Sequence, residues 1–151
     1  MTIDIKAFQA FLYAHIPLIK AMQMQLQSIS ADELTATAPI TPNINDKQTV
    51  FGGSSAALMT ICGWTLIKAN LEHLGVHNDV VIYTAENKWL KAQQDDLIIQ
   101  THINPKIDWS LLANQIYNSN RIQKITVQCQ VLNQEQQVCS KMLGQYVILK
   151  K

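Results

Sequence analysis

Charged side chains are scarce in this sequence, and one long stretch has none at all. Asp, Glu, Lys and Arg make up only 15% of the 151 residues, which is low for a soluble monomer. From Gln48 to Ile67 the chain contains no Asp, Glu, Lys, Arg or His. The low surface charge indicates that part of the surface is buried in an oligomer.

Several other features are missing, and each absence excludes a class of function. The net charge is only +1, and no basic run is interleaved with aromatic residues, so nucleic acid is not an expected partner. The start of the chain, 1–6, has no basic segment followed by an apolar core, so a signal peptide is not expected. The apolar stretch after Gly53 is interrupted by polar residues and favours a buried helix over a membrane span. We therefore expect a cytoplasmic protein that does not bind membranes.

The three cysteines stand singly in apolar patterns, at positions 62, 129 and 139. Their spacing to each other and to the four histidines does not fit a metal site, so we expect buried, reduced thiols and no metal. The hydrophobic content of 48% can supply one sizeable core. The sequence therefore predicts a single domain over residues 1–151.

Apolar periodicity predicts one long helix and six strands. The long helix is expected at 53–73 with Gly75 as its C-terminal cap. A shorter helix is expected at 3–15, ended by Pro17, and another opens at Asp108 within the polar segment 104–121. The strands are expected at 22–29, 34–40, 80–90, 97–103, 122–132 and 138–149.

This element order predicts an α+β domain in which a curved antiparallel six-stranded sheet wraps around one long central helix. Four helix residues are expected to face the sheet: Trp64, Leu66, Ile67 and Leu71. One helix cannot cover six strands, so we expect a homodimer or a dimer of dimers, with the strand at Val80–Thr84 near the interface.

The segment 39–63 carries the strongest functional signal. A polar loop ends in Gly52-Gly53, and the apolar helix begins there. The first N–H groups of a helix have no internal partners, and the helix dipole adds positive charge at that end. Backbone N–H groups of Gly53 or Ser54 could therefore stabilise a developing oxyanion. The alternatives are that the glycines only shape the start of the helix and that Ser54 or Ser55 only caps it.

The loop from Pro42 to Ser54, followed by Gly63-Trp64, resembles the hotdog-fold family first catalogued as thioesterases, whose members decarboxylate malonyl-acyl carrier protein. The resemblance covers essentially the whole chain and implies the hotdog fold. It implies the stand-alone form, without the acetyltransferase domain to which some members are fused. It also implies that the substrate supplies the phosphopantetheine and that no cofactor is needed.

The resemblance assigns the main catalytic role to Asn45, and the N–H groups at the start of the helix add Gly53 and Ser54 to the expected catalytic residues as oxyanion donors. Seven further residues are expected to contact the substrate: Asn43, Asp46, Lys47, Thr49, Phe51, Gly52 and Thr60. In the broader hotdog thioesterases a His-Gly-Gly is common and an acid follows on the helix. Here Phe51 replaces that histidine and Thr60 stands near the place of the acid, which argues against ordinary hydrolysis.

Three functions remain open. Hydrolysis needs an activated water or a carboxylate nucleophile, for which Asp46 and Glu86 are the possible bases. Decarboxylation of a malonyl thioester needs an aligned C–C bond and a stabilised enolate, which backbone N–H groups and the Asn45 amide could provide. The main prediction is therefore a decarboxylase that makes acetyl-acyl carrier protein for the start of fatty-acid synthesis. A thioesterase is the first alternative, and an acyl-thioester-binding module without catalysis is the second.

Other interpretations of the same residues also stand. Asn43 and Asn45 could be turn residues, Asp46 and Lys47 a solvated pair, and Trp89 a core aromatic. The carrier is expected to be acyl carrier protein or coenzyme A. Four cations could form a docking patch for an acidic carrier or could be scattered surface charges: Lys88, Lys91, Arg121 and Lys124.

Overall fold

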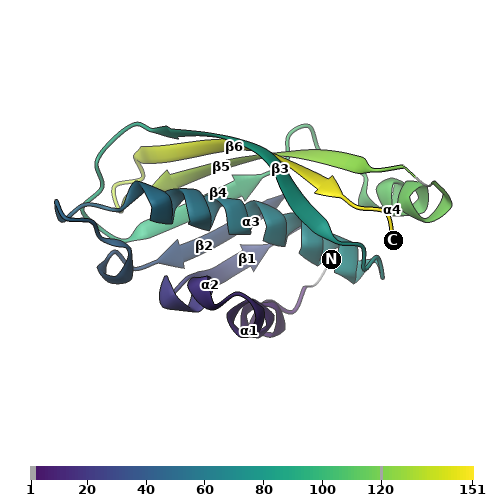
Figure 1. Ribbon diagram of the computed structural model, residues 1–151, viewed down its shortest axis with the longest axis horizontal. Helices are drawn as coiled ribbons and strands as arrows, with labels where there is room; N and C mark the ends of the chain where they lie inside the picture. Colours follow the sequence, from purple (N-terminus) through teal and green to yellow (C-terminus); the bar gives the residue numbers. More distant parts are fainter. Residues whose placement is uncertain (1–2, 120) are drawn as a thin grey trace.

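The computed structural model describes residues 3–119 and 121–151. Its helical elements are α1 (Ile5–His15), α2 (Pro17–Ala21), the 3-10 turn η1 (Thr41–Asn43), α3 (Gly52–His73) and α4 (Trp109–Asn118). Its strands are β1 (Gln25–Ile29), β2 (Glu33–Ala38), β3 (Val80–Trp89), β4 (Leu97–His102), β5 (Gln123–Leu132) and β6 (Val138–Ile148). Figure 1 shows the arrangement of these elements along the molecule.

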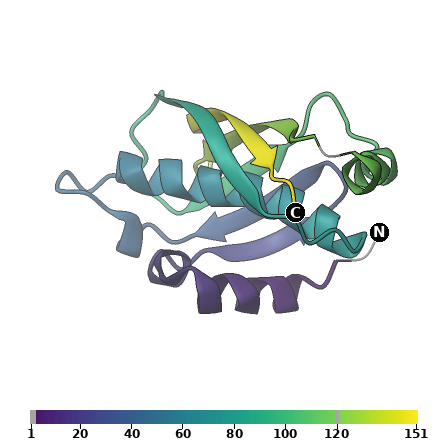
Figure 2. The same ribbon diagram turned by 45° about the vertical axis from the view of Figure 1, so that its right-hand side comes forward.

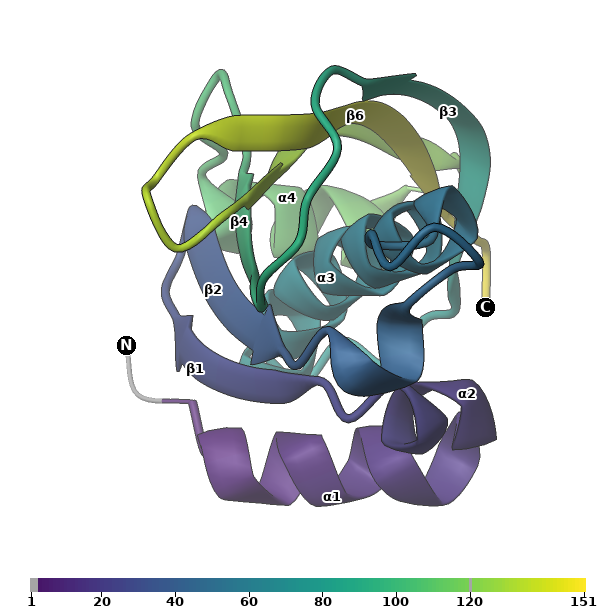
Figure 3. The same ribbon diagram turned by 90° about the vertical axis from the view of Figure 1, so that its left-hand side faces the viewer.

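The six strands form one antiparallel sheet in the order β1-β2-β4-β5-β6-β3. The sheet curls around α3, as the end-on view in Figure 3 shows. Leu58, Leu66, Ile67 and Leu71 of α3 are fully buried in the core. A helix that is apolar on nearly all sides belongs in the centre of a domain. The predicted α+β fold with one central helix is therefore confirmed.

Trp64 departs from its predicted position. Its ring stacks on Phe11 of α1, with ring centroids 6.5 Å apart, and its Nε1 donates to the Val80 carbonyl at 2.8 Å. It is only partly buried, whereas its neighbours on α3 face the sheet. Trp64 therefore joins α1 and β3 to the helix and does not lie in the core between helix and sheet.

Helix α3 and the sheet are in tight contact at Gly63. The Tyr146 side chain on β6 is fully buried, and its hydroxyl donates to the Thr60 carbonyl at 2.6 Å. A Cβ atom at position 63 would overlap the tip of the Tyr146 ring. Glycine at this position is what allows the tyrosine to lie against the helix backbone.

The ends of several helices and strands depend on turn residues, which the apolar periodicity alone does not predict. Pro17 ends α1 as predicted, but it also starts α2, because proline is favoured in the first turn of a helix. The first strand begins at Gln25 because Gln23 has a φ of 57° and turns the chain. Helix α4 runs ten residues, beyond the short helix expected, and Asp108 caps it by accepting from the Leu111 N–H.

The predicted C-terminal cap of α3 is confirmed. Gly75 has a φ of 75° and donates to the Glu72 carbonyl. Val76 donates to the Leu71 carbonyl, which completes a Schellman motif.

The two edges of the sheet differ. On β1, the Leu26 N–H donates to Gln9 Oε1 at 2.7 Å, and Gln9 Nε2 donates to the Met24 carbonyl at 3.0 Å. Helix α1 therefore covers that edge. Strand β3 pairs only with β6, so within the described residues its outer edge has no neighbour. Val81, Ile82 and Tyr83 on it are 43%, 38% and 62% exposed, so β3 is an open, apolar edge.

Candidate active site at the N-terminus of helix α3

Residues 44–50 form a small hairpin that projects beyond the N-terminus of α3 (Figures 1 and 2). Asn45 Oδ1 accepts from the N–H groups of Lys47 and Thr49, at 2.9 and 3.0 Å. Asn45 Nδ2 donates to Thr49 Oγ1 at 2.9 Å. The side chain therefore holds the hairpin together, as its interpretation as a turn residue expected. One of its two Nδ2 hydrogens has no partner within residues 3–119 and 121–151.

The same turn occurs a second time, between β5 and β6. Asn133 Oδ1 accepts from the N–H groups of Glu135 and Gln137, at 3.0 and 2.9 Å. In both turns the fourth residue is a glutamine with positive φ, 62° at Gln48 and 65° at Gln136. Asn133 thus repeats the structural role of Asn45 in a turn that does not lead into α3, and Asn133 does not line the pocket at the start of α3, which makes it a matched control.

The other predicted loop residues have separate roles. Asp46 and Lys47 form an ion pair at 3.3 Å with side chains 81% and 77% exposed, as expected for a solvated pair. Asn43 is buried, and its Nδ2 donates to the carbonyls of Met22 and Pro39 at 3.0 and 2.8 Å. Its own carbonyl accepts from the Phe51 N–H at 2.8 Å. Asn43 therefore fixes the chain just before α3.

The first turn of α3 leaves two backbone donors unused. Phe51 is the N-cap residue, and no side chain caps the helix, so the interpretation of Ser54 or Ser55 as a cap is wrong. The N–H groups of Ser54 and Ser55 both donate to the Phe51 carbonyl, at 2.9 and 3.2 Å. Within the described part of the chain, the N–H groups of Gly52 and Gly53 have no partner. The Ser54 N–H is already engaged, so the available pair is Gly52 and Gly53.

Two aromatic rings pack directly on these glycines. Trp89 Nε1 donates to the Gly52 carbonyl at 3.1 Å, and a Cβ atom at position 52 would lie 2.9 Å from that nitrogen. The Phe51 ring lies against Gly53, where a Cβ atom would overlap it. Trp89 and Phe51 are 57% and 55% exposed, so the expectation of Trp89 as a core residue is wrong. The glycines admit these rings as well as leaving the backbone open to a ligand.

A pocket of about 310 Å³ adjoins this first turn. It is lined by Gly52, Trp89, Lys91 and Gln93 and by the buried serines Ser55 and Ser140, among others. No Asp, Glu or His is among the lining residues. The sequence did not identify Trp89, Ser55 and Ser140 as site residues, because they lie on three different elements. For Trp89 the one available signal was the alternation along β3, which predicts the face of the strand on which each side chain lies.

Thr60 does not reach this pocket. Its Oγ1 donates to the Ala56 carbonyl at 2.8 Å, and it lines a separate apolar groove of about 330 Å³ with Ile61, Ile82 and Tyr146. Glu86 is also directed away, because Trp89 faces α3 and alternation then turns Glu86 to the opposite face of β3. There Glu86 pairs with Lys88 at 3.6 Å.

The four predicted docking cations lie at the two ends of β3. Lys88 pairs with Glu86, and Lys91 Nζ bonds to Gln137 Oε1, both near the Trp89 end. Arg121 precedes β5, and Lys124 Nζ lies 5.1 Å from the centre of the Tyr83 ring, toward the Val80 end. Ten residues of strand span about 33 Å. A single chain therefore does not present the four cations as one patch.

The thiols are poorly suited to nucleophilic chemistry. Burial raises the pKa of Cys62 well above 9.0, and proximity to Cys129 raises it further. Burial raises the pKa of Cys129 to about 12, against a smaller lowering by a hydrogen bond from Thr101. Both groups are therefore protonated at neutral pH, whereas the thiolate is the reactive form.

Replacing Cys62 or Cys139 with alanine is expected to leave turnover within about threefold of the wild type, because neither thiol is ionised or faces the pocket beside Gly52. The measurement is the turnover of an acyl thioester beside a thermal melt. A Cys62→Ala protein that melts normally but is inactive would point to a thiol mechanism instead.

The described residues contain neither a metal-binding cluster nor a membrane-spanning helix. No group of three or more His, Cys, Asp and Glu side chains in 3–119 and 121–151 could hold a metal ion. In the same ranges, no helix combines the length and the apolar character needed to cross a membrane.

Solved structures with the same architecture identify the fold. A "putative thioesterase" from Shewanella oneidensis is 23% identical, with a TM-score of 0.84 over 96% of each chain. A thioesterase from Haemophilus influenzae is 14% identical, with a TM-score of 0.77 over 99% of this chain and 93% of the other. A "probable thioesterase" of unknown function from Pseudomonas aeruginosa is 8% identical, with a TM-score of 0.77 over 100% and 99%. At these identities the likeness shows the fold, and the chain has the hotdog fold.

The family is shown by a match over nearly the whole chain. The model described as "Putative thioesterase (yiiD_Cterm)" matches residues 5–150. The chain belongs to this family. The predicted membership in a thioesterase-like hotdog family is thus confirmed, and the narrower assignment to malonyl-acyl-carrier-protein decarboxylases stays a prediction.

Proposed function

We propose that this protein is an enzyme that acts on acyl thioesters and holds the thioester carbonyl oxygen at the N-terminus of α3. The observation that carries this proposal is the pair of N–H groups on Gly52 and Gly53, which have no partner in the described residues, with Gly52 in the lining of a pocket. Donors of this kind stabilise an oxygen that gains negative charge during reaction. The family match supports the same class of substrate.

Thioester hydrolysis is the reaction that the family match supports best. Water would attack the carbonyl carbon, the thiol would leave, and a base would take the proton from the water. The pocket beside Gly52 has no acid or histidine in its lining. Asp46, which is exposed in the hairpin closed by Ile44 and Val50, remains the candidate base.

Decarboxylation of a malonyl thioester is the second candidate, and the same lining favours it. The C–C bond to the carboxylate breaks and CO2 leaves, the electron pair of that bond forms the thioester enolate, and the enolate carbon takes a proton from water to give the acetyl thioester and hydroxide. No step needs a side-chain base. A pocket without carboxylates does not repel the substrate carboxylate. Asn45 is not among the lining residues, but it has one uncharged Nδ2–H to offer from the hairpin that precedes α3.

The carrier and the setting belong to the proposal as well. The acyl group would arrive on coenzyme A or on acyl carrier protein, with the phosphopantetheine as part of the substrate and no cofactor in the protein. The decarboxylase would supply acetyl thioester for the start of fatty-acid synthesis. The enzyme would work in the cytoplasm.

Mass spectrometry of two thioesters after incubation with the protein separates these reactions. Malonyl-CoA and butyryl-CoA are the substrates, and Gly53→Val is the site variant, because a side chain there would collide with Phe51 and crowd the two donors. Free CoA from both substrates supports hydrolysis, and acetyl-CoA from the malonyl substrate alone supports decarboxylation. Unchanged substrates with tight binding would make the protein a binding module, and the proposal of an enzyme would be wrong.

We also propose that two copies pair through the open edge of β3, where Val81, Ile82 and Tyr83 are exposed. Sedimentation at micromolar concentration is expected to give a dimer or a larger even assembly. Ile82→Lys should shift it toward the monomer of 17.0 kDa, because a charge on an apolar edge opposes pairing. Leu111→Lys, at a residue 55% exposed on α4, is the control and should leave it unchanged. A wild type that sediments as a monomer contradicts the pairing.

A further inference from the structure

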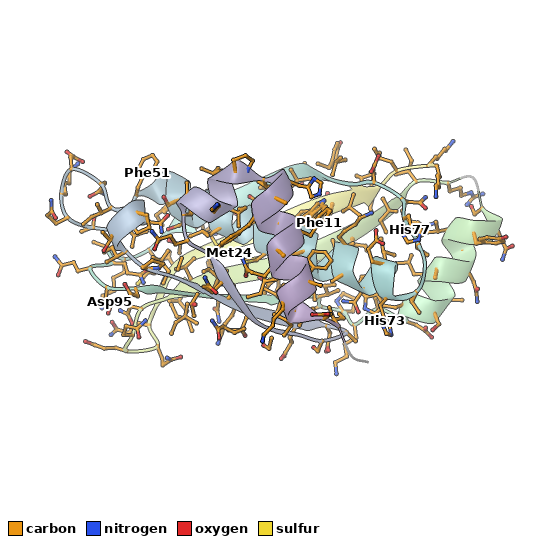
Figure 4. All side chains as sticks on the ribbon, turned by 90° about the horizontal axis from the view of Figure 1, so that it is seen from below. Phe11, Met24, Phe51, His73, His77 and Asp95 are labelled. Atoms are coloured by element: carbon orange, nitrogen blue, oxygen red, sulfur yellow. The ribbon has the colours of Figure 1, made fainter. Side chains whose placement is uncertain are left out.

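Three buried, uncharged polar side chains line the pocket beside Gly52. They come from the first turn of α3, from β6 and from the loop between β3 and β4, and they are Ser55, Ser140 and Gln93. Figure 4 shows Asp95, in the same loop as Gln93, at the same end of the molecule as Phe51, the residue before α3. A buried polar group without a partner costs free energy, so the free bonding capacity of these three side chains decides what the pocket accepts.

The Gln93 side chain, only 3% exposed, keeps one acceptor without a donor. Its Nε2 donates to the carbonyls of Asp96 and Leu132, at 3.0 and 3.1 Å. Because both neighbours are acceptors, they fix which end of the amide carries the nitrogen. Its Oε1 is buried and has no hydrogen-bond partner in the described residues. The backbone carbonyl of Gln93 accepts from the Val50 N–H at 2.8 Å, which ties this loop to the chain just before α3.

The hydroxyl groups of Ser55 and Ser140 are also unused. Further along α3, Thr60 and Thr65 donate to the carbonyls four residues before them, at 2.8 and 2.7 Å. Within residues 3–119 and 121–151, neither Ser55 Oγ nor Ser140 Oγ forms a hydrogen bond, and both residues line the pocket. Ser140 pairs with Trp89 across the β3–β6 ladder, and Trp89 in turn donates to the Gly52 carbonyl. The pocket therefore offers two O–H donors and one acceptor close to the first turn of α3.

A hydroxyl group matches this set better than a carboxylate or an alkyl group. A hydroxyl donates one hydrogen and accepts from up to two donors, whereas a carboxylate only accepts. A carboxylate would leave Gln93 Oε1 without a donor and set a negative charge beside it, and an alkyl group would leave all three side chains unpaired. The lining has one cation, Lys91, whose Nζ donates to Gln137 Oε1, so the test includes a carboxylate ligand.

We propose that this pocket selects acyl groups with a hydroxyl beyond the carbonyl, so that 3-hydroxyacyl thioesters are the substrate class. The inference rests on the proposed function, because it sets the carbonyl oxygen at the Gly52 N–H. Ser55 follows Gly52 by three residues, about 4.5 Å along the helix axis. A hydroxyl on the third carbon, two bonds beyond the carbonyl carbon, extends toward that depth. Such a substrate has no carboxylate to lose, so of the two candidate reactions it goes with hydrolysis.

Calorimetric titration with three thioethers of coenzyme A tests this selection without turnover. They carry a butyl, a 3-hydroxybutyl or a 2-carboxyethyl group, and they lack the carbonyl on which the enzyme would act. The 3-hydroxybutyl compound is used as each enantiomer. The wild type should bind the better enantiomer at least about tenfold more tightly than the other two compounds, because only the hydroxyl satisfies both the donors and the acceptor of the pocket.

Two variants assign the preference to the named side chains. Ser55→Ala/Ser140→Ala removes both donors with little change of shape and should reduce the preference to about threefold or less. Gln93→Met removes the acceptor and should do the same. The control Ser28→Ala/Ser110→Ala removes two exposed hydroxyls, one from a strand and one from a helix, and should keep the preference. A thermal melt shows that each variant is folded, and the ratio of two affinities does not depend on a modest loss of stability.

The outcomes separate this inference from the proposed function. Equal affinity of the wild type for the butyl and 3-hydroxybutyl compounds overturns the selection, even if thioesters are hydrolysed, and so does a lack of binding by all three. Tightest binding of the carboxyethyl compound also overturns it and assigns the pocket to a malonyl group. A preference that survives in either folded variant shows that these side chains do not cause it. A hydroxyl preference that both variants lose, with no turnover of 3-hydroxybutyryl-CoA or of any other thioester, supports the pocket and contradicts the enzyme.

Discussion

Replacing Asn45 with alanine is expected to slow malonyl-thioester decarboxylation about 30- to 1000-fold, if decarboxylation is the reaction. The loss corresponds to roughly 2–4 kcal/mol of transition-state stabilisation for one removed oxyanion donor. The physical basis is the Nδ2 hydrogen that the hairpin leaves without a partner in the described residues. That hydrogen can donate to the enolate oxygen or to the substrate carboxylate while the side chain adds no charge.

Asn45→Asp distinguishes the two reactions. For decarboxylation it should be at least as damaging as alanine, because it exchanges a donor for an acceptor and sets a negative charge beside the substrate carboxylate. A water-activating thioesterase would respond differently, since an added carboxylate could act as a base. The measurement is the rate of formation of acetyl thioester and of free thiol for both variants.

Asn133→Ala is the control that separates catalysis from turn stability. It removes the same pair of N–H bonds from a turn of the same geometry, between β5 and β6. Its effect on the melting temperature should match that of Asn45→Ala, whereas its rate should stay near the wild type. If Asn45→Ala keeps near wild-type decarboxylation at matched stability, Asn45 has no part in the mechanism.

Gly63→Ala is expected to destabilise the fold by about 1–3 kcal/mol, which is the usual range for overpacking a core. Alanine is the better helix former by about 1 kcal/mol, so the sign of the effect depends on the collision with Tyr146. That ring cannot swing away, because it is fully buried and its hydroxyl is bonded to the Thr60 carbonyl. Urea denaturation measures the change in the free energy of unfolding.

A double-mutant cycle with Tyr146→Leu assigns the cause. In that background the tip of the ring is gone, so the cost of Gly63→Ala should shrink or reverse. A cost that is unchanged in the Tyr146→Leu background would show that the penalty comes from elsewhere on α3.

The sequence predicted best those features that depend on local pattern. For α3, every signal lies within one segment: Gly52-Gly53 mark the start of the helix, the apolar run marks its length, and Gly75 marks its C-terminal cap. The alternation of apolar and polar residues predicted the bounds of the six strands to within a few residues. Pro17 shows the limit of local rules, because the same residue ends one helix and starts the next.

The site was predicted less completely because it is assembled from distant segments. Trp89 reaches Gly52 only because β3 lies beside α3, a contact across 37 positions in the chain. Thr60 follows Gly53 by seven residues, which places it about 10 Å along the helix and into the apolar groove. Turn chemistry predicts that Asn45 bonds to its own hairpin. It does not predict how many Nδ2 hydrogens of Asn45 stay without a partner after those bonds form.

Gln9 has a consequence for how many copies can join. By bonding to Leu26 and Met24 it covers the β1 edge of the sheet. In the described residues, β3 is then the one strand edge left to pair with another copy. Once two copies have paired through their β3 edges, neither has a second open edge, so strand pairing ends at two copies. A chain without α1 would have two reactive borders, and the same strand chemistry would then allow open-ended growth into filaments.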